Sequence, residues 1–200
     1  MTHDFTHDLT VKPLTSKTFP DLEALFAKKG CSFARDCWCM GYRLSGKVIP
    51  PKGTSLADHR KTLIEDRARH KPAPGLIGYD KSGAPVGWVT FGPREEFARL
   101  KRSPVMKPVD DTPVWSILCF VVPSPHRGQG VAAEMLSHAV AFAKKSGVTA
   151  IEAYPIDKAE RSQSQFLWHG AMSMFAKAGF KEIARRKPER PVMRLTFAGS

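Results

Sequence analysis

The chain has 200 residues and a formal net charge of +12, with a sequence pI of about 9.8. A chain of this length can bury the core of one domain, and we expect a single domain over residues 1–200. No apolar run reaches the length of a membrane span, and the first residues lack the basic and apolar regions of a secretory signal. The sequence therefore excludes a helical membrane protein. We expect a cytoplasmic protein whose positive field attracts anionic ligands.

The first half of the chain predicts a strand, helices and a hairpin. Residues 9–14 are typical of a strand, and residues 19–29 have the apolar spacing of an amphipathic helix. Residues 75–79 and 85–91 are separated by the turn sequence at 80–83, which indicates an antiparallel hairpin. The expected order in this half is strand, helix, helix and two antiparallel strands.

Three of the four cysteines, Cys31, Cys37 and Cys39, lie close together in the sequence, and Cys119 lies in a predicted buried strand. Thiolates can ligate zinc, but structural zinc sites usually combine two pairs of ligands, each pair separated by about two to four residues. We therefore predict no metal site. A redox pair and a set of reduced, partly buried thiols remain as alternatives.

An insert at residues 93–114 carries both signs of charge and is longer than a simple connection between strands. We expect a short helix over residues 95–101, followed by an extended loop that contains proline. Loops of this length are often functional. The insert covers a ligand site or packs at the edge of a homodimer, and the sequence leaves both alternatives open.

Residues 114–157 are the most informative part of the chain. They predict an apolar strand, a glycine loop, a helix over residues 128–146 and a second strand. The two glycines let the backbone turn tightly, and the helix N-terminus presents unpaired N–H groups and the positive end of the helix dipole. An arginine adds a cation beside them. We therefore predict a phosphate-binding loop formed by Arg127, Gly128, Gln129, Gly130, Val131 and Ala132.

The last part of the chain predicts a short helix and two strands. Residues 171–179 are typical of a helix that ends at a glycine, and Phe180 opens a strand after it. Residues 191–197 alternate between apolar and polar side chains, which indicates a final strand.

The glycine loop resembles the acyl-CoA-binding motif Arg/Gln-x-x-Gly-x-Gly/Ala of the GNAT superfamily of N-acyltransferases. Arg127, Gly130 and Ala132 match its three fixed positions. The expected order of elements is similar to that of GNAT proteins over nearly the whole chain. The resemblance implies an α/β fold with a central twisted mixed β-sheet flanked by helices. It also implies direct transfer of an acetyl group from acetyl-CoA, as cosubstrate, to a primary amine.

The resemblance also implies how the donor is held. In GNAT proteins the strand before the loop parts from its parallel neighbour, and its free backbone groups bind the pantetheine arm. Phe120, Val121 and Val122 match these positions. Phe175 is expected to contact the donor, but it stands where many members carry a tyrosine that protonates the leaving thiolate. Trp168 replaces a frequent asparagine, which puts contacts to CoA from that side in doubt.

Two residues are candidates for proton transfer. Glu152 and Tyr154 alternate onto one face of the second strand of the motif, where the tyrosine is a candidate acid and the glutamate a candidate base. The alternative is an ordinary strand face covered by a helix. By the resemblance, Trp38, Tyr42 and Arg43 are candidates for the wall of the acceptor pocket. For the two aromatic residues, filling of the core is the alternative.

Two rival functions remain. The same fold can hold acyl-CoA without turnover, as a binding module. The basic charge and the cysteines point instead to a nucleic-acid or metal–thiol protein, but the basic residues are scattered and no nucleic-acid-binding motif organises them. We therefore expect a small-molecule or peptide amine as the partner, and no nucleic acid.

Overall fold

A computed structural model describes residues 8–157 and 168–197 of the chain. Its helices and strands follow the order expected from the sequence, with one additional short helix. In chain order they are β1 (Thr10–Pro13), α1 (Phe19–Ala27), α2 (Ser32–Cys37), α3 (Leu56–Arg67), β2 (Gly75–Tyr79), β3 (Pro85–Pro93), β4 (Trp115–Val121), α4 (Val131–Lys145), β5 (Ala150–Ala153), α5 (Met172–Lys177), β6 (Lys181–Lys187) and β7 (Arg190–Thr196).

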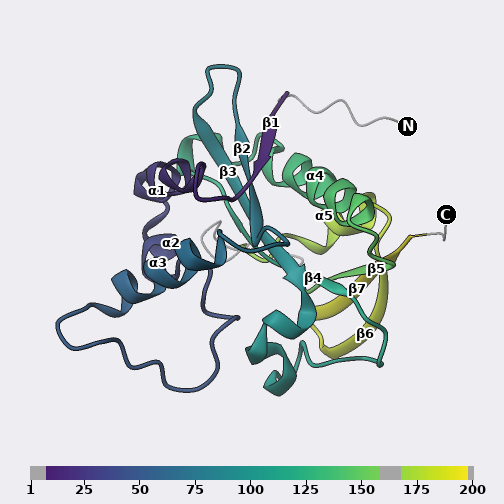
Figure 1. Cartoon of the computed structure of the whole chain (residues 1–200). Coiled ribbons are helices and arrows are strands. Elements are labelled where there is room, and N and C mark those ends of the chain that lie inside the picture. Colours follow the sequence, from purple (N-terminus) through teal and green to yellow (C-terminus); the bar gives the residue numbers. More distant parts are fainter. Residues whose placement is uncertain (1–7, 158–167, 198–200) are drawn as a thin grey trace.

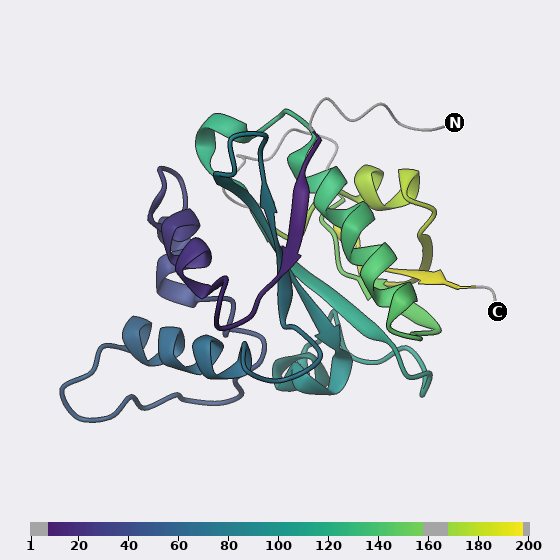
Figure 2. The same cartoon turned by 45° about the horizontal axis from the view of Figure 1, so that its top comes forward.

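The described strands form one mixed sheet with the order β1-β2-β3-β4-β5-β7-β6. Neighbouring strands are antiparallel except for β4 and β5, which run parallel. Figure 1 shows helices on both sides of this sheet. In the turned view of Figure 2, α4 covers one face and α1, α2 and α3 lie on the other. The prediction of a mixed α/β sheet flanked by helices is therefore confirmed.

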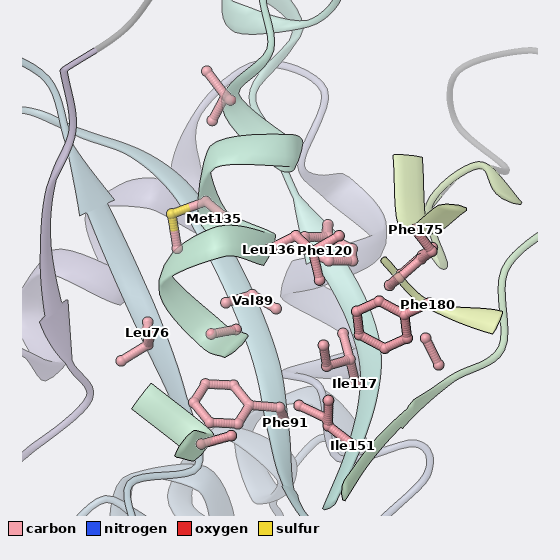
Figure 3. Close-up of a cluster of buried hydrophobic side chains, with 14 of the residues drawn as sticks. Leu76, Val89, Phe91, Ile117, Phe120, Met135, Leu136, Ile151, Phe175 and Phe180 are labelled. Carbon is pink, nitrogen blue, oxygen red and sulfur yellow. The ribbon is translucent and has the colours of Figure 1, made fainter. Parts of the chain in front are cut away.

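The core between α4 and the sheet depends on the apolar stripe of this helix. Met135 and Leu136 are buried and belong to the same cluster as Phe120, as the close-up in Figure 3 shows. Two glycines on the sheet make room for the helix. A Cβ added to Gly78 would lie 2.5 Å from the sulfur of Met135, and one added to Gly87 would lie 3.1 Å from its Cγ. Burial of each large side chain contributes about 1.5–3 kcal/mol, and the lack of a side chain at these two glycines makes the close packing of Met135 possible.

A second cluster lies between the sheet and the N-terminal helices. Trp38, just after α2, has its ring centroid 5.3 Å from that of Phe26 and 6.2 Å from that of Phe19, both on α1. Trp88 of β3 is fully buried and contacts Phe26 edge-on at 6.4 Å. These ring contacts fix the N-terminal helices on the face of the sheet opposite to α4.

Three local predictions need correction. The cysteine-containing segment forms the short helix α2, which the sequence did not predict. The helix expected over residues 95–101 is two 3-10 turns, Arg94–Glu96 and Ala98–Arg102, because Phe97 adopts ψ 73° and turns its side chain into the core. The helix expected from residue 128 begins at Val131, because the two preceding glycines have positive φ values that a right-handed helix does not allow.

Within the described ranges, no helix is both long enough and apolar enough to cross a lipid bilayer.

Candidate functional site

The two parallel strands part near their C-terminal ends. β4 and β5 pair only from Trp115 opposite Ile151 to Ile117 opposite Ala153, whereas β4 continues to Val121. On its other side, β4 shifts register against β3 between Thr90 and Phe91, which leaves Leu118 as an extra, bulged residue. A bulge bends the strand that carries it, and here it coincides with the point where β4 leaves β5.

Residues 168–172 enter the gap between the parted strands. The Phe120 N–H donates to the Trp168 carbonyl at 2.6 Å, and the Ile156 N–H donates to the Gly170 carbonyl at 3.0 Å. The Trp168 ring stacks on Phe33 of α2, with centroids 4.4 Å apart and an angle of 6° between the planes. The segment therefore ties the end of β4 to the chain after β5 and reaches across to α2.

A cleft of about 1140 Å³ lies above the parted end of β4. Its walls come from four places: the end of β4, the glycine loop with the start of α4, residues 168–177 that lead into and form α5, and residues 30–39 around α2. Clefts that hold drug-sized ligands usually measure about 300–1,000 Å³, so this one has room for a larger ligand.

The glycine loop at the mouth of the cleft has the backbone geometry that the sequence predicts. Gly128 and Gly130 have φ values of 76° and 91°. The Gly130 carbonyl accepts the first helical hydrogen bonds from Ala133 at 2.9 Å and Glu134 at 3.1 Å. The N–H groups of Val131 and Ala132 have no acceptor within the helix, as at every helix N-terminus. Both residues line the cleft.

Arg127 lines the same cleft and fastens the loop to the rest of the fold. Its Nε donates to the Val122 carbonyl at 2.9 Å, and one terminal nitrogen donates to the Gly30 carbonyl at 2.7 Å. The guanidinium therefore links the end of β4 to the turn between α1 and α2. Arg127 and the first residues of α4 line the same cleft.

Gly30→Ala is expected to loosen this attachment. Gly30 has φ 86°, and a Cβ there would lie 2.0 Å from Ser124 Oγ and 3.0 Å from a terminal nitrogen of Arg127. Gly46→Ala is the matched control, because Gly46 has φ 75° and no atom within 4 Å of its added Cβ. We expect Gly30→Ala to lower the free energy of unfolding in urea by about 1–3 kcal/mol more than the control. Equal losses would show that contacts around residue 30 do not hold the loop.

Some of the residues expected to contact the donor line the cleft, and others do not. Phe120, Val121 and Val122 line the cleft, but the Phe120 N–H and the Val122 carbonyl already have the partners described above, so they are not free as expected. The Gln129 amide donates to the Pro125 carbonyl at 2.8 Å. Phe175 is fully buried in the core beneath the cleft and contributes no lining surface.

The side chains of Glu152, on β5, and Tyr154, just after its end, lie together, as alternation predicts, but neither lines the cleft. The two oxygens of the fully buried carboxylate accept hydrogen bonds from Arg94 at 2.9 Å and Arg194 at 2.6 Å. The Tyr154 hydroxyl donates to the same carboxylate at 3.1 Å and lies 2.9 Å from the Ser116 hydroxyl. Burial and the Glu152 charge raise the pKa of Tyr154. Glu152 and Tyr154 therefore belong to a buried hydrogen-bond network with Arg94, Arg194 and Ser116, away from the cleft.

The three residues expected at the acceptor pocket do not come together at the cleft. Trp38 is part of the core under α1 and α3. Arg43 is buried in an ion pair with Glu96, and its guanidinium carbon lies 4.3 Å from the centroid of the Phe97 ring. Tyr42 is half-buried, and it alone of the three reaches the parted strands, through His169.

His169 is one of several titratable residues that the sequence offers as candidates without ranking them. Its Nδ1 lies 2.7 Å from the carbonyl of the bulged Leu118, and its Nε2 lies 2.9 Å from the Tyr42 hydroxyl. A carbonyl only accepts, so Nδ1 carries the proton and Nε2 accepts from the tyrosine. Burial, together with the nearby Arg190 charge, lowers the pKa of His169 from 6.5 to about 3. The ring is therefore neutral at physiological pH.

The buried neutral ring predicts a pH dependence of stability. Between pH 6.5 and about 3, an unfolded chain binds a proton at His169 and the folded protein does not. The free energy of unfolding therefore falls as the pH drops through this range, by up to about 1.4 kcal/mol per pH unit. Urea unfolding between pH 6.5 and 5 should show a shallower pH slope for His169→Asn than for the native protein. Parallel slopes would contradict a neutral histidine.

All four cysteines line the cleft, and all are free thiols. Trp88 Nε1 donates to the sulfur of Cys39 at 3.1 Å, and the Cys119 thiol lies 3.8 Å from the Phe120 carbonyl. Cys39 and Cys119 belong to one buried cluster. In the part of the chain that the structure describes, no group of three or more His, Cys, Asp or Glu side chains is arranged to hold a metal ion. No sequence pattern predicts that Cys119 lines the same cleft as the N-terminal cysteines.

Comparison with known proteins supports the resemblance seen in the glycine loop. The model of the acetyltransferase (GNAT) family matches residues 42–180 of the chain. No curated protein matches the sequence significantly. Among solved structures, the fold is similar to arylalkylamine N-acetyltransferase 2 from Aedes aegypti. The TM-score is 0.57 and the identity 12%, and the match covers 94% of this chain and 99% of the other.

Two further structures have the same fold. One is described as histone acetyltransferase HPA2 and related acetyltransferase from Corynebacterium glutamicum, with TM-score 0.54, 20% identity and coverage of 96% and 98% of the two chains. The other is the PaiA N-acetyltransferase from Thermoplasma acidophilum in complex with coenzyme A, with TM-score 0.52, 13% identity and coverage of 95% and 99%. The family match covers well over half of the sequence, and the fold agrees along its length. The chain belongs to the acetyltransferase (GNAT) family.

Proposed function

We propose that the protein transfers an acetyl group from acetyl-CoA directly to a primary amine. The single observation that carries this proposal is the cleft at the parted end of β4, whose mouth is the open N-terminal end of α4. A helix end with glycines before it binds phosphate groups, and Arg127 adds a cation on the same side. Membership of the acetyltransferase family indicates that the phosphate-containing ligand is an acyl-CoA.

The residues of the cleft fit acetyl-CoA. Its diphosphate would be held by backbone N–H groups of Gly128 to Ala132, a loop whose two glycines have positive φ values. The parted end of β4 and the stacked pair of Phe33 and Trp168 would line the pantetheine arm. The cleft volume of about 1140 Å³ suits a ligand of this size.

Bound acetyl-CoA supplies an activated acyl group as a thioester. The protein's part in this proposal is mainly to hold donor and amine in position, which supplies much of the rate of such reactions. Backbone N–H groups near the bulge at Leu118 are suited to stabilise an oxyanion. Tyr42 remains the acceptor-side residue of the proposal, because its hydrogen bond to His169 places its hydroxyl beside the parted strands. Glu152 and Tyr154 have a structural part in the proposal, since their hydrogen bonds connect β5 with Ser116 of β4 and with two arginines.

A second candidate function is a binding module that holds acyl-CoA without turnover. The observation in its favour is Phe175, which occupies the position of the tyrosine acid of many GNAT proteins and is sealed in the core. Among the described residues, those lining the cleft include no aspartate or glutamate that replaces that acid.

Release of free CoA thiol from acetyl-CoA separates the two candidates. It should be measured at steady state with alkylamines, polyamines, aminoglycosides and peptides with free N-termini. An acetyltransferase releases CoA in proportion to one class of amine, with the acetylated amine as the second product. A protein that binds acetyl-CoA in calorimetry but shows no amine-dependent release is a binding module. A folded protein that does not bind acetyl-CoA would refute both candidates.

A further inference from the structure

The thiols of the cleft have no task in the proposed function, although every cysteine of the chain lies there. Cys31, Cys37 and Cys39 come from the segment around α2, and Cys119 comes from β4. Cys39 and Cys119 line the cleft while being only 6% and 7% exposed. The fold therefore brings thiols from two distant parts of the chain to the cleft that is proposed to bind a thiol cofactor.

Two of these thiols, Cys39 and Cys119, belong to one buried cluster. The sulfur of Cys39 accepts a hydrogen bond from Trp88 Nε1 at 3.1 Å. The neighbouring Cys119 thiol and the Trp88 indole lower the pKa of Cys39, whereas the neighbouring Cys39 and burial raise the pKa of Cys119. Cys39 is therefore suited to attack, because the thiolate is the nucleophilic form, and Cys119 retains its proton.

The backbone at Cys39 gives a second, independent observation. Trp38 and Cys39 have φ values of 48° and 53°, and they are the two non-glycine residues with positive φ in the described ranges. Each such conformation costs on the order of 1–3 kcal/mol, and such residues cluster at functional sites. In this conformation the Cys39 sulfur accepts the hydrogen bond from the Trp88 indole and lies in the same buried cluster as Cys119.

We propose that Cys39 and Cys119 form a dithiol site that reacts with disulfides of coenzyme A. The inference rests on the proposed function, because the glycine loop would bind the nucleotide half of the disulfide and bring its sulfur bond to the thiols. A tethered reactant has an effective concentration of the order of millimolar, well above that of a micromolar free reagent.

The reaction has two steps of thiol–disulfide exchange. The Cys39 thiolate attacks one sulfur of the disulfide, forms a mixed disulfide with one CoA and releases the other CoA as thiolate. The Cys119 sulfur then attacks the mixed disulfide at Cys39, and its proton goes to the departing CoA thiolate. The protein gives up two electrons and the CoA disulfide gains them, so the products are one Cys39–Cys119 disulfide and two molecules of reduced CoA.

The test treats the reduced full-length protein with CoA disulfide and, separately, with glutathione disulfide, followed by mass spectrometry of the intact protein and its peptides. We expect the native protein to lose two hydrogens and to show a peptide linked through Cys39 and Cys119. Cys119→Ser should instead trap one CoA on Cys39, and Cys37→Ser is the matched control that still forms the internal disulfide. CoA disulfide should react about 10-fold or more faster than glutathione disulfide.

Peptide mapping of the native protein keeps the test independent of how the variants fold. A CoA adduct on Cys31 or Cys37 in place of Cys39, or no reaction at all, would overturn the proposal. Calorimetry with acetyl-CoA on the same preparation separates the two claims. If acetyl-CoA binds but no disulfide forms, only the dithiol site is refuted. If acetyl-CoA does not bind and the two disulfides react at equal rates, the proposed function fails as well.

Discussion

Replacement of Gly130 by aspartate is expected to weaken the binding of acetyl-CoA by about 100-fold or more. Gly130 is the N-cap of α4 and has φ 91°, so a side chain there is strained, but a carboxylate would lie beside the first helical N–H groups. It would compete with the donor for these open amides and would place a negative charge against the diphosphate. Hydrogen bonds to charged groups contribute about 1.5–3 kcal/mol each, so the loss of two suffices for this effect.

Gly83→Asp is the matched control for the cost of a side chain at positive φ. Gly83 has φ 80°, nothing lies within 4 Å of its added Cβ, and it sits in the turn between β2 and β3. It adds the same charge to the protein without lining the cleft. Isothermal titration should show native affinity for this control. Similar affinities for the Gly130 variant and the native protein, with both folded, would contradict binding at the end of α4.

Glu152→Ala is expected to lower the free energy of unfolding by about 3–5 kcal/mol. The carboxylate is fully buried, and its loss leaves Arg94, whose side chain is 11% exposed, without its acidic partner. Arg194, 13% exposed, keeps its ion pair with Asp110. The substitution also removes the acceptor of the Tyr154 hydroxyl and opens a small cavity.

Glu182→Ala is the control for this prediction, because it removes an exposed ion pair with Arg185 that contributes at most about 1 kcal/mol. Urea unfolding compares the two variants, and acetyl-CoA titration at low temperature provides the second readout. We expect Glu152→Ala to retain affinity for acetyl-CoA, since Glu152 does not line the cleft. Native stability combined with a large loss of turnover would instead identify Glu152 as the catalytic base.

The sequence alone predicted most of the fold because the relevant signals are local. Alternation marks β7, turn residues mark the hairpin of β2 and β3, and the apolar spacing marks the body of α4, although not its first residue. The short helix α2 was missed because six residues with a cysteine on either side carry little periodic signal. The interruption at Phe97 was missed because only the core contacts of its side chain explain it.

The backbone geometry of the glycine loop could be predicted from the sequence. The environments of the buried polar side chains could not, because their partners are distant in the chain. Loop geometry requires only the local sequence around Gly128 and Gly130. The environment of Glu152 depends on Arg94 and Arg194, which lie 58 and 42 residues away in the chain. His169 finds its partners at separations of 51 and 127 residues, which no local pattern reveals. No local pattern reveals either that Cys39 and Cys119, from distant parts of the chain, belong to one buried cluster.

A crystal structure of the protein with acetyl-CoA tests the central claim most directly. We predict electron density for the diphosphate within hydrogen-bond distance of the N–H groups at the start of α4, and for the pantetheine arm along the parted end of β4. Density for the donor at another surface, with the end of α4 empty, would contradict the account.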